Sequence, residues 1–124
     1  SDRARSLICH FEKQFPHVHF SLISPESAGH GFKLIVNATS AGLQPGGSPV
    51  EKDFFQSGIT AYDLIYNPPE TLFLRYAREA GAKYRNGLEM LVWQAAASFE
   101  LWTGKPMPTE DILVKLTKII SQKS

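Results

Sequence analysis

Short polar segments that follow apolar runs hold the residue types that could bind a ligand. Asn37, Ala38 and Thr39 follow one apolar run, and Tyr66 ends another. The carboxyl ends of parallel strands are where open α/β sheets bind ligands, and a polar turn there offers backbone amides and hydroxyl groups. The phenol of Tyr66 can hydrogen-bond a hydroxylated ring or a carboxylate. Alternatively, the turn satisfies only its own backbone, and Tyr66 is a half-buried packing residue.

Gly87, Met90 and Gln94 form a second group of candidates. Their spacing of i, i+3 and i+7 places them on one face of a helix. Gly87 has no side chain, so a ligand can approach the backbone there, and Gln94 offers hydrogen-bond donors and acceptors two turns later. Alternatively, Gly87 only begins the helix and Gln94 is an incidental polar residue. Because the flanking faces are apolar, Gln94 needs a partner, which favours a binding role.

Other reactive side chains are better explained by structure than by chemistry. His17 and His19 alternate on a predicted strand and point to the same face, but two ligands are too few for a metal site. Glu110 and Asp111 are adjacent acids that suit the first turn of a helix. Cys9 is the single cysteine and is expected to be a packing residue. The sequence therefore predicts no metal centre, and no Ser-His-Asp arrangement can be argued from it.

The composition is that of one ordinary globular domain. The chain has 124 residues, of which 43% are hydrophobic and 20% charged, and its formal net charge is +1. This balance does not suggest nucleic acid, a membrane surface or a polyanion as a partner. The apolar stretches are too short to span a bilayer, and no apolar run follows the first basic residues as a secretory signal requires. A single cysteine fits a reducing compartment, so we expect a cytoplasmic protein.

The elements that must position the candidate residues are three predicted strands and four predicted helices. The strands are expected at residues 17–22, 32–36 and 59–65. The run at 32–36 is compact and apolar, which is typical of a strand buried on both faces of a parallel sheet. Residues 24–31 are rich in turn formers, and residues 40–58 are expected to form a loop.

Apolar residues recur at helical spacing in four segments. These segments are 2–14, 68–80, 87–103 and a last helix from Thr109. Pro16 ends the first and Gly81 stops the second, which Pro68-Pro69 opens. Asn86 is expected to cap the third, with Glu89 completing a capping box, and Thr109 to cap the last. The third helix carries two apolar stripes and is therefore expected to be sandwiched between layers.

Helices combined with buried strands predict an α/β layered fold. The sequence opens on a predicted helix and contains no G-x-G-x-x-G turn, with which a doubly wound sheet normally starts. We therefore expect the sequence to begin partway through a domain.

Three segments together resemble signatures of the shikimate dehydrogenase family. They are residues 34–42 (LIVNATSAG), residues 62–71 (YDLIYNPPET) and residues 86–96 (NGLEMLVWQAA), the last continuing through Phe99, Trp102 and Gly104. The opening Arg3-Ala4 with Leu7 resembles the helix after the family's second Rossmann strand. The resemblance implies a partial Rossmann-like domain, a doubly wound parallel sheet with C-terminal helices. Residues 1–124 would be the C-terminal part of an NADP-binding domain, without the N-terminal substrate and catalytic domain.

The resemblance also implies which residues bind. Those expected at the cofactor are Arg3, Asn37, Ala38, Thr39, Leu64, Gly87 and Met90, and those expected at the substrate are Tyr66 and Gln94. A guanidinium at position 3 suits the adenosine 2′-phosphate of NADP. The family's catalytic Lys and Asp belong to its N-terminal domain, so no catalytic residue is assigned here. Leu72 departs from the proline that the family more often has after Glu-Thr.

The activity that the resemblance implies is the reversible reduction of 3-dehydroshikimate to shikimate with NADP, in aromatic amino-acid biosynthesis. Two alternatives stay open. One is a quinate/shikimate dehydrogenase-like paralogue that uses NAD. The other is a non-catalytic fragment that binds nucleotide or self-associates as a homodimer, because a partial sheet leaves a strand edge and apolar helix faces exposed.

Overall fold

The computed structural model describes residues 2–24, 31–44 and 46–122. The chain divides into two compact units, Ser1–His30 and Gly31–Ser124. Each unit is described by itself. None of the helices in the described ranges is long and apolar enough to cross a lipid bilayer.

The first unit is built on helix α1, Asp2–Gln14, which confirms the predicted helix. The ring of Phe11 packs against the rings of Phe15 and Phe20, with centroids 6.3 and 6.2 Å apart. The predicted strand at 17–22 is wrong, because a strand needs a neighbour for its hydrogen-bond ladder and this segment folds back onto α1 instead. Most of the turn-rich segment 24–31, namely residues 25–30, lies outside the described residues.

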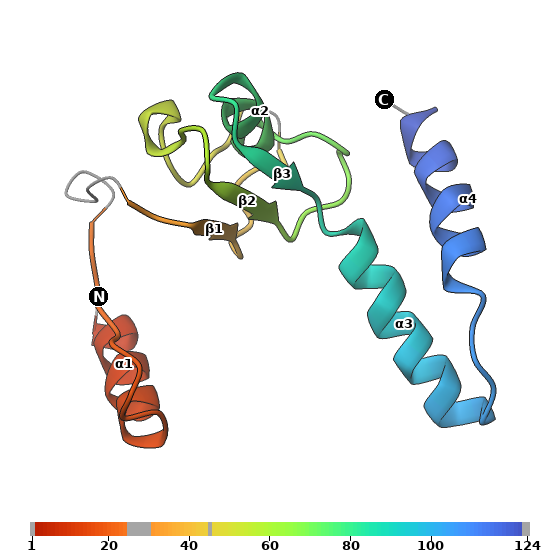
Figure 1. Cartoon of the computed structure of the whole chain (residues 1–124), viewed down its shortest axis with the longest axis horizontal. Coiled ribbons are helices and arrows are strands. Elements are labelled where there is room, and N and C mark those ends of the chain that lie inside the picture. The colour runs from red at the N-terminus through yellow and green to blue at the C-terminus, as the bar shows by residue number, and fades with distance from the viewer. Residues whose placement is uncertain (1, 25–30, 45, 123–124) are drawn as a thin grey trace. The chain divides into compact units, whose positions relative to one another are not determined.

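The second unit contains a parallel three-stranded sheet in the order β1-β2-β3 (Figure 1). The strands are β1 (Leu34–Asn37), β2 (Thr60–Asp63) and β3 (Lys83–Arg85). Asn37 pairs in register with Asp63, so the two strands end side by side. The predictions at 32–36 and 59–65 are confirmed as strands. Strand β3 was not predicted, because its three residues are all exposed and show no apolar alternation.

Helix α2, Leu72–Glu79, covers one face of this sheet. The core is a cluster of buried side chains from β2, α2 and the segments beside them, namely Phe55, Ile59, Ala61, Phe73, Leu74, Ala77 and Ala82. The short 3-10 helix η2, Lys52–Phe54, lies within the predicted loop and leads into this cluster. Strand β1 is not buried on both faces as predicted. Ile35 packs against the core, whereas Leu34 and Val36 alternate with it and are 56% and 48% exposed.

The hydroxyl of Thr71, and not the proline pair before it, starts helix α2. Its Oγ1 accepts a hydrogen bond from the backbone N of Leu74 at 3.3 Å, which is N-cap geometry. The predicted start at Pro68 is therefore four residues too early. Gly81 has a φ of 74° and ends the helix as predicted.

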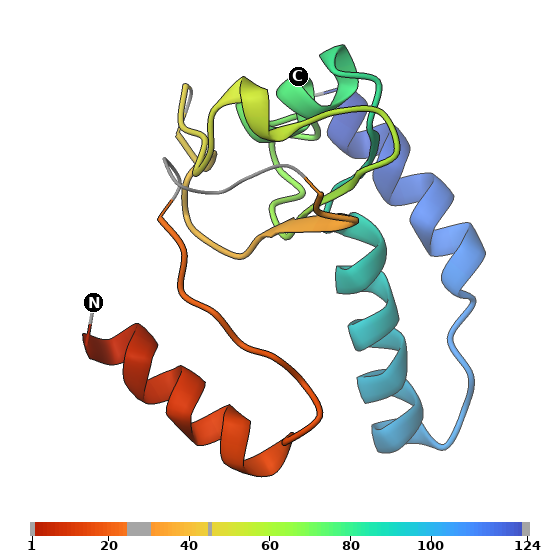
Figure 2. The same cartoon turned by 60° about the vertical axis from the view of Figure 1, so that its left-hand side comes forward.

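Helices α3 (Leu88–Thr103) and α4 (Thr109–Ser121) pack side by side and form a hairpin (Figures 1 and 2). Within α3 only Leu88 and Val92 are buried. The second apolar stripe consists of Trp93, Ala97 and Leu101 and is exposed, with Trp93 61% and Leu101 83% accessible, and Trp102 at the end of the first stripe is 81% accessible. The expected sandwich between layers is therefore wrong for the part of the chain described, because α4 is the helix that packs along α3.

The predicted caps of these two helices differ in detail. Gly87 is the N-cap of α3, while Oδ1 of the preceding Asn86 accepts from the backbone N of Leu88 at 3.1 Å. The N-cap of α3 makes no side-chain hydrogen bond, so the capping box is not formed. Thr109 is the first residue of α4 and not its cap, and its hydroxyl donates to the carbonyl of Met107 at 3.0 Å.

Candidate functional site

A pocket of about 330 Å³ lies where β1 and β2 end. Its lining residues are Ala38, Thr39, Leu43, Leu64, Ile65, Tyr66 and Asn67. Four of the predicted site residues, two from each strand end, are thus brought together. The lining combines apolar and polar side chains, and the pocket lies at the sheet edge where parallel α/β sheets bind ligands.

A buried hydrogen-bond network ties the two strand ends together. Asn37, Asp63 and Thr71 are 1%, 0% and 2% exposed. Nδ2 of Asn37 donates to Oδ1 of Asp63 at 3.1 Å, and Oγ1 of Thr71 donates to Oδ2 at 2.5 Å. The backbone N of Ile65 also donates to Oδ1, at 3.0 Å. One carboxylate therefore contacts β1, the segment after β2 and the start of α2.

The amide of Asn37 is engaged at both ends. Its Oδ1 accepts from the backbone N and the hydroxyl of Thr39, at 3.0 and 2.7 Å. Its Nδ2 donates to the carbonyl of Ala41 at 3.0 Å as well as to Asp63. The side chain therefore shapes the turn at residues 37–41, and Ala38 and Thr39 are exposed on that turn. Direct contact of Asn37 with a cofactor stays a prediction.

Gly87 lies against the backbone of Leu64. Its N donates to the carbonyl of Ile65 at 3.1 Å. A Cβ added at Gly87 would lie 2.1 Å from the carbonyl O of Leu64, closer than real Cβ atoms approach any atom. Only glycine fits here. The sequence predicted that a ligand approaches the backbone of Gly87, and in the structure the backbone of Leu64 lies against it.

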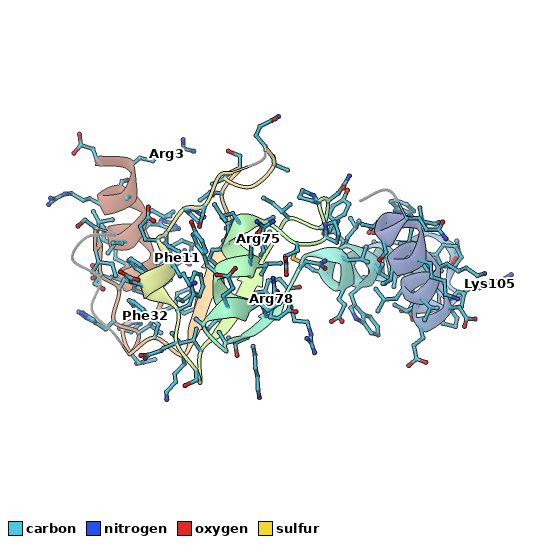
Figure 3. All side chains as sticks on the ribbon, turned by 90° about the horizontal axis from the view of Figure 1, so that it is seen from above. Arg3, Phe11, Phe32, Arg75, Arg78 and Lys105 are labelled. Carbon is cyan, nitrogen blue, oxygen red and sulfur yellow. The ribbon has the colours of Figure 1, made fainter. Side chains whose placement is uncertain are left out.

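The remaining predicted site residues do not line this pocket. Met90 and Gln94 are exposed on the first two turns of α3. Because Gln94 is exposed, water can satisfy its amide, and the argument that it needs a protein partner or ligand does not hold. Arg3 lies on α1, in the other unit (Figure 3).

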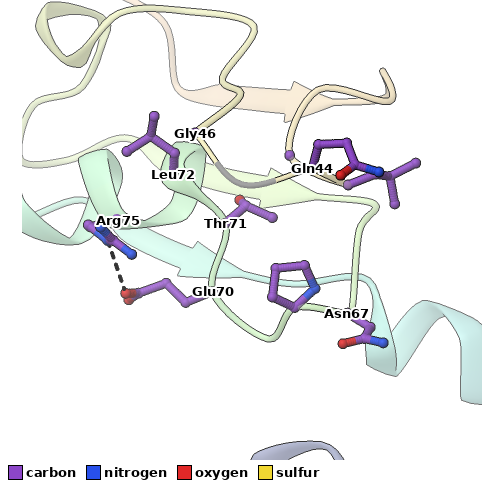
Figure 4. Close-up of a pocket in the computed structure, with 10 residues that line it drawn as sticks. Gln44, Gly46, Asn67, Glu70, Thr71, Leu72 and Arg75 are labelled. Carbon is purple, nitrogen blue, oxygen red and sulfur yellow. Dashed lines mark ion pairs between the residues drawn. The ribbon is translucent and has the colours of Figure 1, made fainter. Parts of the chain in front are cut away.

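A second pocket, of about 570 Å³, lies between the loop after β1 and the start of α2 (Figure 4). Its charged groups are paired. Oε2 of Glu70 lies 3.8 Å from Nε of Arg75, and Oε1 lies 2.8 Å from Nε of Arg78. The hydrogen bond and negative charge of Glu70 raise the pKa of Arg78. This pocket is larger, but none of the predicted site residues lines it, so we assign the predicted site to the smaller one.

A further close ion pair occurs among the described residues. Nζ of Lys52 lies 2.7 Å from Oε2 of Glu79, and this contact raises the pKa of Lys52 and lowers that of Glu79. It joins η2 to α2, away from the pocket. No group of three or more His, Cys, Asp or Glu side chains that could hold a metal ion occurs among the described residues.

Asp63 and Thr71 were not among the site residues predicted from the sequence. A signal was present, because Asp63 is a charged residue inside the mainly apolar run at 59–65 and a threonine follows eight positions later. A buried charge must be paired or hydrogen-bonded, so a carboxylate inside a predicted strand at 59–65 required donors nearby if that strand was buried.

Comparisons with known proteins show similarity to shikimate dehydrogenases. The family model for the shikimate 5'-dehydrogenase C-terminal domain matches residues 87–113. A curated relative, shikimate dehydrogenase (NADP(+)) of Streptococcus pneumoniae, is 50% identical over 86 residues, which are 68% of this chain and 30% of the relative. The chain thus spans less than a third of the length of that relative.

Solved structures give the same result. A chorismate mutase/shikimate 5-dehydrogenase fusion protein from Clostridium acetobutylicum is 48% identical with a TM-score of 0.64, covering 71% of this chain and 34% of its own. Shikimate 5-dehydrogenase from Thermus thermophilus, in complex with NADP(H) and shikimate, is 43% identical with a TM-score of 0.62, covering 65% of this chain and 31% of its own. The chain described here is homologous to the C-terminal, Rossmann-like portion of the shikimate dehydrogenases.

Proposed function

We propose that this chain is the cofactor-binding portion of an NADP-dependent shikimate dehydrogenase. The complete protein would catalyse the reversible reduction of 3-dehydroshikimate to shikimate. NADP, when bound, supplies or accepts the hydride. The residues of this chain bind and orient the cofactor and one side of the substrate, and none of them is assigned a catalytic role.

The observation that carries the proposal is the pocket at the carboxyl ends of β1 and β2. Its residues fit one end of a dinucleotide, because Ala38, Leu43 and Leu64 offer apolar surface to a flat ring. The Thr39 oxygen, whose hydrogen is donated to Asn37, can still accept a hydrogen bond from a ribose hydroxyl. Its volume of about 330 Å³ is within the range of small-ligand sites. The match to NADP-dependent relatives supports the same ligand.

The remaining predicted residues complete the proposal. Tyr66, 40% exposed at the mouth of the pocket, would hydrogen-bond the substrate, and Gln94 would approach it from α3. Gly87 and Met90 would flank the nicotinamide end of the cofactor. Arg3 would pair with the 2′-phosphate, for which a guanidinium is well suited.

The proposal is tested by assaying the product of the complete gene with shikimate or quinate, each against NADP and NAD. Turnover confined to shikimate with NADP is expected. Turnover with quinate and NAD would instead support the paralogue that the sequence left open. No turnover with any pair would contradict an enzymatic role and leave a nucleotide-binding or self-associating protein.

We further propose a cytoplasmic homodimer that has small molecules as its ligands. The exposed apolar side chains of Trp93, Leu101 and Trp102 on α3 support self-association. Light scattering on the purified protein tests this part, because a monomer at all concentrations would contradict it.

A further inference from the structure

The three hydrogen bonds that described residues make to the carboxylate of Asp63 are all donated to it. Oγ1 of Thr71 accepts from the backbone N of Leu74, so its single hydrogen is free to point at Asp63. Oδ1 of Asn37 accepts from Thr39, so its Nδ2 faces Asp63. The third neighbour is the backbone N–H of Ile65. In this arrangement the two acceptor oxygens of a carboxylate satisfy all three donors at once.

Two of these donors, Asn37 and the backbone N–H of Ile65, belong to the two strand ends beside the proposed cofactor pocket, whereas Thr71 begins α2 and lines the second pocket. Asn37 holds Thr39, on the turn after β1. The bond to Ile65 fixes the turn after β2, where Leu64 and Tyr66 lie. Asp63 itself is fully buried and lines neither pocket. Its carboxylate can influence a ligand only through the strand ends that it holds.

We infer that Asp63 is a positioning residue, which holds the two strand ends in the arrangement that binds the dinucleotide. The inference rests on the proposed function. Replacing Asp63 with asparagine keeps the shape but removes the charge and one acceptor oxygen. The NH₂ group then faces either the two donors of Asn37 and Ile65, or Thr71, whose hydroxyl must turn to accept from it and gives up the bond that it donates. The two strand ends would then lose the hydrogen bonds that join them through residue 63, and only part of the molecules would hold the arrangement that binds the dinucleotide.

The kinetics distinguish positioning from a purely structural role. If about one molecule in ten holds the competent arrangement, the apparent KM for NADP rises roughly tenfold, and kcat at saturating cofactor is retained. A variant that merely leaves part of the protein misfolded loses kcat in proportion and keeps the KM of the wild type.

The experiment uses the complete gene product and four variants. D63N and T71V remove, respectively, an acceptor and a donor of the network, and T71S restores the hydroxyl. D53N is the matched control, because Asp53 is an exposed aspartate on η2. We would measure kcat and the KM for NADP at saturating shikimate, the dissociation constant for NADP, and amide hydrogen exchange at Thr39 and Ile65.

We expect D63N and T71V to raise the KM and the dissociation constant for NADP about tenfold with kcat within roughly twofold of the wild type. Exchange at Thr39 and Ile65 should become faster, T71S should stay near the wild type, and D53N should change nothing. If D63N does not fold, the KM for NADP of T71V compared with that of T71S tests the inference instead. An unchanged KM for NADP in a folded variant, or a lower kcat at the same KM, overturns the inference about Asp63 and leaves the proposed function standing. A wild-type protein that binds no NADP overturns the proposed function itself.

Discussion

Replacing Gly87 with alanine should disturb both the fold and the proposed site. The added Cβ would start 2.1 Å from the carbonyl O of Leu64, and real Cβ atoms essentially never come closer than 3.0 Å to another atom, so the two backbones must separate by roughly 0.9 Å. The φ of Gly87 is −75°, which alanine adopts freely, so the cost is steric and not conformational. Overpacking of this kind costs about 1–3 kcal/mol of stability.

The same displacement should weaken catalysis, because Leu64 and Gly87 are both proposed cofactor contacts. A misplacement of about 1 Å can cost roughly 100-fold in rate, so we expect kcat/KM for NADP to fall by about 10- to 100-fold. Denaturant unfolding and steady-state kinetics of the complete gene product measure the two effects.

The matched control is Gly81→Ala. Gly81 has a φ of 74° and nothing within 4 Å of the added Cβ, so alanine there costs about 1–2 kcal/mol of backbone strain without a clash. Gly81→Ala should therefore lower stability and leave the KM for NADP unchanged. The reasoning is refuted if Gly87→Ala has wild-type stability, or if it is destabilised but keeps the wild-type kcat/KM for NADP.

Three further predictions concern the core, the substrate and the surface. Phe73→Ala should lower the free energy of unfolding by about 3–5 kcal/mol, because Phe73 is fully buried and packs edge-to-face on Phe55; denaturant titration showing a loss below about 1 kcal/mol would contradict this core. Tyr66→Phe should raise the KM for shikimate by about 2- to 10-fold, the worth of one hydrogen bond, with the KM for NADP unchanged; an equal rise in both would argue against a substrate role. Glu79→Gln should lower stability slightly at neutral pH. The hydrogen bond and charge of Lys52 lower the folded-state pKa of Glu79, so the contribution is present above its ordinary value of 4.5 and lost as pH falls through the folded value. Unfolding measured from pH 7 to pH 3 should therefore show the difference from the wild type shrinking, and a difference that grows toward low pH would contradict the assigned pair.

The parts of the fold that follow local rules were predictable from the sequence. Strand β1 lies in a compact apolar run and β2 lies within the mainly apolar run at 59–65, and Gly81 ends α2 with the positive φ that glycine supplies. The placement of Ala38 and Thr39 beside Leu64 also followed, because parallel strands end at a common edge.

What could not be predicted depends on tertiary contacts. Strand β3 is three exposed residues whose pairing with β2 leaves no pattern in the sequence. The segment at 17–22 alternates like a strand but packs its Phe20 on α1 instead. The close contact of Gly87 with Leu64, and the network around Asp63, join residues that are far apart in the chain, so neither the needed glycine nor the donors could be derived from spacing.

The central claim is that the ends of β1 and β2 bind NADP. A crystal structure of the complete gene product soaked with NADP tests it most directly. The account predicts the nicotinamide half of the cofactor in the pocket lined by Ala38, Thr39 and Leu64, with Gly87 beside it. A dinucleotide bound elsewhere, for example in the larger pocket beside Arg75, would contradict it.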